Sequence, residues 1–307
     1  MWMYLHYTDN RYEGIFLLTK DQILRKLLSV DLELAKQLII SYIRNYFIRS
    51  HAKMAIMGLS GGVDSSTTLA LLVEALGSDR VHVLILPYEG VSPKRDIEDA
   101  ISLSESFKVK YDVISIKPMV DSFRNILERN LGNLERITIG NIMARTRMIT
   151  LYAYANNLGG LVVGTGDKSE IMIGYFTKYG DGAADIMPIG DLYKTQVRRL
   201  ALKLGVPEEI AFKTSSPALW AGQEAEAELG AKYEDIDAVL YALIELGLDP
   251  SEVLEIKDID KKVITLVLSR VSKYEHKRKP PAIPNIQKII AYLSENQEIS
   301  YPPKKSQ

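Results

Sequence analysis

The chain has 307 residues, 47% of them hydrophobic, and a formal net charge of −1. This near-neutral charge disfavours a protein that grips long nucleic acid, because such proteins carry a basic excess that pairs with phosphates. The absence of cysteine excludes disulfides, thiolate metal sites and a cysteine nucleophile. No apolar run reaches transmembrane length and residues 1–20 lack a signal-peptide pattern, which predicts a cytoplasmic protein without membrane or nucleic-acid partners.

The N-terminal part of the chain carries one clear helix signal. Residues 1–20 are aromatic and irregular, and residues 1–23 are predicted to form an N-terminal extension. Asp31 is a candidate cap for a helix over residues 32–49. The broad apolar stripe of that helix is typical of packing on a sheet and equally of a dimer interface.

Strands and helices alternate over the rest of the chain. This alternation predicts a doubly wound α/β fold, with a mainly five-stranded parallel sheet and helices on both faces. The predicted domain covers residues 24–284, and residues 285–307 are assigned to a C-terminal helix and tail. Residues 214–230 are either a mobile loop or a surface linker. Strands are predicted at residues 53–59, 81–87, 111–116, 161–163 and 186–189, and helices at 67–77, 92–107, 118–129, 141–157, 193–205, 233–246, 258–272 and 284–294.

A glycine-rich turn, SGGVDSS at residues 60–66, stands between the first predicted strand and its helix. Such a turn points backbone N–H groups and the positive end of a helix dipole at one spot, which favours an anion. No Lys-Ser or Lys-Thr follows the glycines, so the turn is not a Walker A motif. Asp64 beside a phosphate requires a divalent cation between them. An isolated Gly-Gly would indicate an ordinary helix-capping turn, but the whole string favours a phosphate site.

Residues 60–66 resemble the pyrophosphate loop of the N-type ATP pyrophosphatases, which include NAD synthetase, GMP synthetase and asparagine synthetase. Over roughly residues 24–281 the chain resembles the NAD synthetase family in particular. It departs mildly from the family at residues 166–168, a loop that the family varies. The segments that carry the resemblance are GNIMARTRM (140–148), GTGDKSE (164–170), GYFTKYGDG (174–182), ADIMP (184–188), KTQ (194–196), GQ (222–223) and HKR (276–278).

The resemblance implies ATP-dependent amidation of deamido-NAD to NAD through an adenylated carboxylate, with release of pyrophosphate and AMP. It also implies Mg²⁺ as cofactor, ATP as co-substrate, ammonia as nitrogen donor and a homodimer. Glutamine-dependent members carry an added amidase domain with a cysteine nucleophile. Because this chain has no cysteine, it is predicted to lack a built-in glutaminase, so free ammonia or a separate partner supplies the nitrogen.

The resemblance assigns roles to individual residues. Asp64 and Glu170 are expected to hold one Mg²⁺, Lys194 to neutralise the leaving pyrophosphate, and Asp181 to orient the nicotinate end or the incoming ammonium. These four are the implied catalytic residues. The implied ATP-binding residues are Gly58, Leu59, Ser60, Gly61, Gly62, Val63, Asp64, Ser65, Ser66, Thr165, Lys194 and Ser216. The implied deamido-NAD-binding residues are Arg145, Lys178, Asp181, Asp185, His276 and Lys277.

Two other functions stay open at this point. The ATP pyrophosphatase subunit of another amidating synthetase, such as GMP synthetase, would share residues 60–66 but not 174–182. A non-catalytic adenine-nucleotide sensor would need the loop but neither Glu170 nor Lys194. Taken one at a time, Glu170, Lys194 and each charged residue of the implied deamido-NAD site are as well explained as solvated surface charges.

Overall fold

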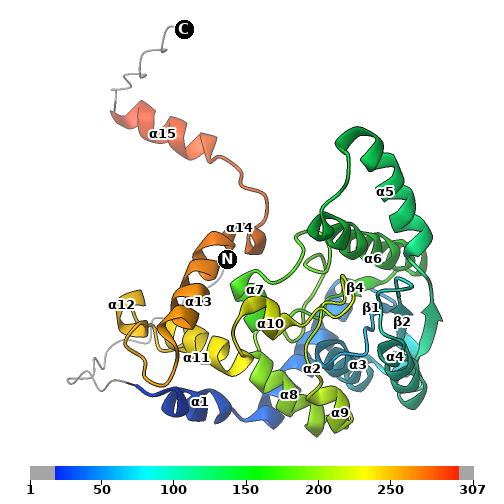
Figure 1. Ribbon diagram of the computed structural model, residues 1–307, viewed down its shortest axis with the longest axis horizontal. Helices are drawn as coiled ribbons and strands as arrows, with labels where there is room; N and C mark the ends of the chain where they lie inside the picture. Colours follow the sequence, from blue (N-terminus) through cyan, green and yellow to red (C-terminus); the bar gives the residue numbers. More distant parts are fainter. Residues whose placement is uncertain (1–17, 297–307) are drawn as a thin grey trace, which may run out of the picture.

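The computed structural model describes residues 18–296 and contains, within them, one parallel sheet of strand order β3-β2-β1-β4 (Figure 1). The strands are β1 (Ala55–Gly58), β2 (Val81–Ile85), β3 (Lys110–Val113) and β4 (Leu161–Val163). Since β1 pairs in parallel with both β2 and β4, the carboxyl ends of these three strands meet at one edge. Loops that follow β1 and β4 are therefore brought side by side, as a parallel α/β sheet requires.

The predicted five-stranded sheet is wrong by one strand, because the sheet within residues 18–296 has four. The segment predicted as the fifth strand makes only a single parallel bridge, between Val163 and Ile186. Gly164 N–H donates to the Ile186 carbonyl oxygen at 2.9 Å, and Asp185 N–H donates to that of Val162 at 2.9 Å. The next residues cannot lengthen the ladder, because β4 ends at Val163 and Pro188 has no N–H to donate.

Helices cover both faces of the sheet, which confirms the predicted α/β layering. Alternate residues of a strand point to opposite faces. Ala55 and Met57 of β1 pack in one hydrophobic core with α2 (Leu32–Arg49) and α3 (Val63–Leu76). Ile56 packs in a different core, against α5 and α6. The other helices that complete these two layers are α4 (Lys94–Ser106), α5 (Lys117–Leu131), α6 (Arg136–Leu158), α8 (Lys194–Lys203) and α9 (Glu208–Ala211), with a 3-10 turn at Ser78–Arg80.

A separate, entirely helical core lies beside the sheet (Figure 1). Its centre is α11 (Tyr233–Ile244), and α1 (Lys20–Leu28) packs on it with Ile23 and Leu27 buried. Helix α1 crosses the boundary at residue 23 that the sequence analysis drew for the N-terminal extension, and a Thr19–Gln22 capping box starts it. Residues 1–17 of that extension lie outside the described residues. The helices around this core are α1 (Lys20–Leu28), α7 (Lys168–Ile173), α10 (Ala225–Leu229), α11 (Tyr233–Ile244), α12 (Pro250–Val253), α13 (Lys261–Lys273) and α14 (Glu275–Arg278).

The predicted C-terminal helix is present as α15 (Ile286–Asn296), which Figure 1 shows apart from the sheet at the end of an extended segment. Ile286, Ile289 and Ile290 on this helix are exposed. The tail at residues 297–307 lies outside the described residues. Among the helices of residues 18–296, none is long and apolar enough to cross a membrane.

Candidate active site

The glycine turn joins β1 to α3, where the sequence analysis expected it. Gly61 has a φ of +76°, and a Cβ added there would lie 2.3 Å from the Asp96 carbonyl oxygen, so only glycine fits. Helix α3 begins at Val63, and the N–H groups of its first turn have no acceptor within the helix. The turn therefore presents unpaired donors and a positive dipole end, which together suit an anionic group.

The serines of the turn mainly hold its shape. Ser65 Oγ donates to the Gly62 carbonyl oxygen at 3.1 Å and accepts from Ser60 N–H at 3.2 Å. Ser66 is fully buried, and its Oγ donates to the same carbonyl oxygen at 2.8 Å. These bonds fix the turn before any ligand arrives, so less conformational freedom is lost on binding.

A cavity of about 540 Å³ lies beyond this turn, between α6, residues 174–181 and residues 213–220. Residues 214–220 form one wall of this cavity, and residues 225–229 of the same predicted segment form helix α10. Three of the predicted ATP-binding residues do not line the cavity: Gly61, Ser66 and Lys194. The others line the cavity: Gly58, Leu59, Ser60, Gly62, Val63, Asp64, Ser65, Thr165 and Ser216.

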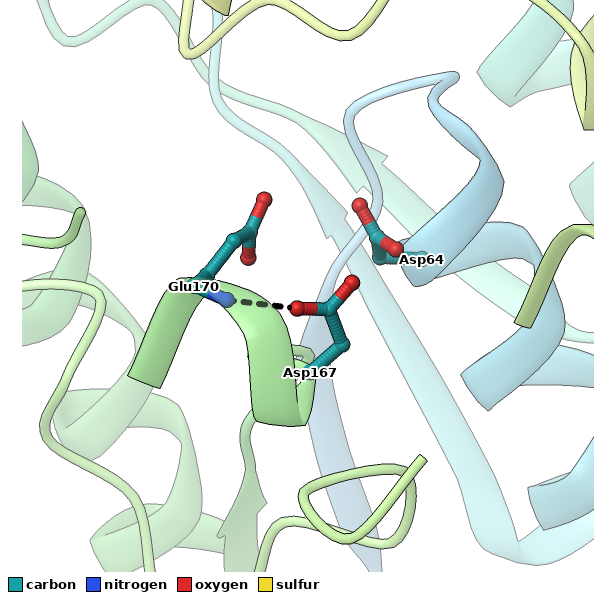
Figure 2. Close-up of side chains that lie close together, drawn as sticks. All are labelled: Asp64, Asp167 and Glu170. Atoms are coloured by element: carbon teal, nitrogen blue, oxygen red, sulfur yellow. Dashed lines mark hydrogen bonds between the residues drawn. The ribbon is translucent and has the colours of Figure 1, made fainter. Parts of the chain in front are cut away.

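Three carboxylates converge beside the turn, as Figure 2 shows. Asp64 comes from the first turn of α3, whereas Asp167 and Glu170 come from the start of α7, and their oxygens lie within 4.8 Å of one another. Lys194, the first residue of α8, places its Nζ 2.6 Å from Asp64 and 2.9 Å from both Asp167 and Glu170. The predicted pair Asp64 and Glu170 is thus brought together, and Asp167 joins it.

Asp167 is the acid that the sequence analysis did not select. Its carboxylate is fully buried, and its Oδ1 caps α7 by accepting from Glu170 N–H at 2.8 Å. The available signal was its place directly before a helix that follows a strand, which is the usual position of an N-cap. Because the N-cap role alone accounts for an aspartate at this position, the sequence did not indicate that Asp167 also belongs to the carboxylate cluster.

Burial shifts the titration of this cluster. It raises the pKa of Asp167 to about 6 and the pKa of Glu170 well above its ordinary range, although the Lys194 ammonium opposes both shifts. Burial by itself would lower the pKa of Lys194, but the three carboxylates outweigh it and raise that pKa well above its usual value. Lys194 is therefore a fixed positive charge at neutral pH.

The donor set suits the implied Mg²⁺. Asp64 Oδ1 is buried, and no described residue donates a hydrogen bond to it. Asp64 and Glu170 both face the cavity, with side-chain exposures of 20% and 21%. Mg²⁺ is bound in proteins through one or two carboxylates together with substrate phosphates. A carboxylate pair with an unused oxygen, next to a phosphate-binding turn, matches that requirement.

The predicted deamido-NAD-binding residues separate into two groups. Asp181 and Lys277 line the cavity. Arg145, Lys178 and His276 form a chain outside it: Arg145 Nη2 donates to the Lys178 carbonyl oxygen at 3.2 Å, and Lys178 Nζ donates to that of His276 at 2.6 Å. In this second group Arg145 and His276 are exposed and Lys178 is half-buried, and none of the three lines the cavity.

Asp185, the remaining residue of that set, is also outside the cavity. Its Oδ2 accepts from Val162 N–H at 2.7 Å and so ties the segment after residue 183 to β4. Lys277 has a similar holding contact, since its Nζ donates to the carbonyl oxygens of Gly174 and Phe176 at 2.8 and 2.7 Å. Burial lowers the pKa of Lys277. Both residues stabilise the backbone around the cavity in addition to any contact with a ligand.

Asp181 and Arg147 carry opposite charges, and both line the cavity. Asp181 lines the cavity, and its Oδ1 accepts from Thr177 N–H at 2.9 Å. Arg147 lines the same space, and its Nε donates to the Leu86 carbonyl oxygen at 3.0 Å. Burial lowers the pKa of Arg147 to about 10, while Asp181 favours its charged form. Within the GNIMARTRM segment (140–148), the sequence analysis selected Arg145 and did not select Arg147.

The fold and this site define the class of a nucleotide-binding α/β protein. The sequence model of the family described as NAD synthase matches residues 35–281. An NH3-dependent NAD⁺ synthetase of Hyperthermus butylicus is 51% identical over 262 residues, which are 85% of this chain and 94% of that protein. Two solved structures each cover 84% of this chain and are themselves covered completely. They are NMN synthetase from Francisella tularensis (32% identity, TM-score 0.73) and NH3-dependent NAD synthetase from Campylobacter jejuni (30% identity, TM-score 0.69).

The chain belongs to the NAD synthase family and is an enzyme of the ligase class. The resemblance drawn from residues 60–66 and the later segments is confirmed. The two other functions, a GMP synthetase subunit and an adenine-nucleotide sensor, receive no support from these comparisons.

Proposed function

We propose that the protein amidates deamido-NAD to NAD, with ATP and ammonia as co-substrates and an adenylated nicotinate carboxylate as intermediate. Family membership supports this activity. The structural observation that carries the proposal is the position of Asp64 and Glu170. Their carboxylates face the same cavity as the unpaired N–H groups at the start of α3, so a phosphate site and a cation site adjoin.

In the first step of this proposal, an oxygen of the nicotinate carboxylate attacks the α-phosphorus of ATP, and the bond to pyrophosphate breaks. The N–H groups of the α3 turn hold the phosphates and stabilise the negative charge that moves onto pyrophosphate. Mg²⁺ bound by Asp64 and Glu170 would supply further neutralisation of that charge. Lys194 lies behind both acids, from where its positive charge acts on the same group.

In the second step, ammonia attacks the acyl carbon, AMP leaves, and one proton is released. Asp181 is the cavity acid that can orient the nicotinate end or the incoming ammonium. Its carboxylate is held in place by the Thr177 N–H, which donates to Oδ1 at 2.9 Å. Arg147 lines the same cavity and adds a positive charge to it.

We further propose that the protein is a homodimer, because a dinucleotide that reaches the outer group needs a second wall there. The sequence analysis left α2 open as either a sheet-packing helix or a dimer interface, and Leu34, Leu38 and Tyr42 on that helix are exposed. A second exposed apolar face lies on α5 and the start of α6, with Phe123 and Ile126 among its residues. This second face shares α6 with Arg145.

A cytoplasmic location remains part of the proposal.

The activity is tested by incubating the purified protein with deamido-NAD, ATP, Mg²⁺ and ammonium, and measuring NAD, AMP and pyrophosphate. Equal formation of all three products is expected. Xanthosine monophosphate serves as the acceptor for the GMP synthetase alternative. A parallel reaction that would yield nicotinamide mononucleotide tests the activity named for the Francisella relative. ATP binding without pyrophosphate release, with any acceptor, would overturn the proposed function.

A further inference from the structure

Lys194 and Asp167 form the rear of the carboxylate cluster. Both side chains are fully buried and neither lines the cavity, whereas Asp64 and Glu170 do. The Lys194 ammonium contacts all three acids at 2.6–2.9 Å. It therefore cannot touch a ligand in the cavity while these contacts are kept.

Asp167 differs from the other two acids because its carboxylate is fully buried, does not line the cavity and caps α7. Oδ1 accepts the Glu170 N–H at 2.8 Å, and Oδ2 pairs with Lys194 at 2.9 Å. The ring of buried Tyr233 lies 5.0 Å from the Lys194 Nζ and supports the ammonium by a cation–π contact. The backbone N–H of Lys194 is held as well, by Ser169 Oγ at 2.9 Å. The ammonium is thus fixed by its surroundings.

We propose that Asp167 is a positioning residue that keeps Lys194 as a built-in counter-charge behind the two cation-binding acids, Asp64 and Glu170. Three carboxylates and one ammonium carry a formal charge of −2 when all are ionised, which matches one divalent cation. Two carboxylates and the ammonium would carry only −1. Asp167 thereby sets the charge that the cation meets without contacting it. This role rests on the proposed function, since the cation belongs to that function.

Mn²⁺ binding to the full-length protein tests the proposal, measured at pH 8 without nucleotide from the electron paramagnetic resonance signal of free Mn²⁺. In Asp167→Asn the side chain still caps α7, because asparagine is as good an N-cap as aspartate. We expect Mn²⁺ affinity to fall roughly 10- to 100-fold, the usual effect of losing a residue that supports metal ligands. The matched control is Asp191→Asn, an exposed acid that pairs with Lys168 outside the cluster, and its affinity should not change.

The double variant Asp167→Asn/Lys194→Gln separates charge from ligation. It removes one negative and one positive group, so the cluster returns to −2 and affinity should return to near the wild-type value. If affinity stays as low as in Asp167→Asn alone, Asp167 is itself a ligand and the proposal is overturned. Unchanged Mn²⁺ affinity in the single variant also overturns it, even if the double variant does not fold. The Mn²⁺ titration needs no substrate, so it tests this proposal independently of the activity. If the Mn²⁺ affinities of the variants change as expected but the protein forms no NAD, only the proposed function is rejected.

Discussion

Replacement of Glu170 by glutamine removes one cation-binding charge while keeping the shape of the side chain. The carboxylate faces the cavity and lies 2.9 Å from the Lys194 ammonium, so it acts at the place where pyrophosphate gains charge. Loss of one such preorganised electrostatic contact costs on the order of 3–4 kcal/mol, or roughly 10²–10³ in rate. We expect pyrophosphate release in a single turnover to slow by that factor. Asp64→Asn should behave in the same way.

The stability of the Glu170→Gln variant should change little. Burial, with added repulsion from Asp167 and Asp64, raises the pKa of Glu170, so its ionised form is disfavoured in the fold. Glutamine removes that repulsion, and Lys194 keeps its contacts to the other two acids. The free energy of unfolding is therefore expected to shift by less than about 1 kcal/mol, as is usual outside tightly packed cores.

The assay combines rapid-quench measurement of pyrophosphate with thermal unfolding of the same samples. Asp191→Asn is the matched control, because this exposed acid pairs with Lys168 outside the cavity and its loss should leave the rate unchanged. Near-normal pyrophosphate release by Glu170→Gln would refute the two-carboxylate cation site. A large fall in melting temperature would instead show that Glu170 serves the fold.

Four further outcomes are expected. Gly61→Ala should destabilise the protein by more than about 1 kcal/mol in urea unfolding, because its φ is positive and the Asp96 carbonyl leaves no room for a Cβ; an unchanged midpoint would contradict this. Lys194→Met should cost about 3–5 kcal/mol in the same assay, since it leaves three acids without their partner. Burial raises the pKa of Asp237 to about 7, so the folded state binds more protons between about pH 4 and 7. The stability that this residue contributes is complete below pH 4 and is lost as pH rises through 7, and Asp237→Asn should remove that slope from unfolding curves measured across pH. Hydrogen exchange in residues 214–220, which line the cavity, should slow when deamido-NAD and an uncleavable ATP analogue bind, and equal rates would argue against a lid.

Much of the site was predictable because its elements are local. The turn at residues 60–66 carries its own geometry: the glycines permit the backbone, and the following apolar residues form α3. Strands β1, β2 and β4 were placed correctly for the same reason, since short apolar runs bounded by turn residues specify them, and β3 (KYDV) was placed from the alternation of strands and helices. Family segments then indicated Asp64 and Glu170, and these do converge. Helix α1 escaped prediction because its burial depends on α11, more than two hundred residues away.

Tertiary structure alone decided which side chains share the site. Arg145 and Arg147 are two positions apart on α6, so they point to nearly opposite sides of the helix, and only its packing on the sheet turns Arg147 into the cavity. Asp167 reads as a helix cap from sequence, and it becomes the partner of Lys194 because β4 pairs beside β1 and α8 starts against α7. The order of residues along the chain is enough to determine the local turns, helix caps and strands. The charge balance of the site arises only where these distant elements meet, because Coulomb energies depend on distances that sequence spacing does not contain.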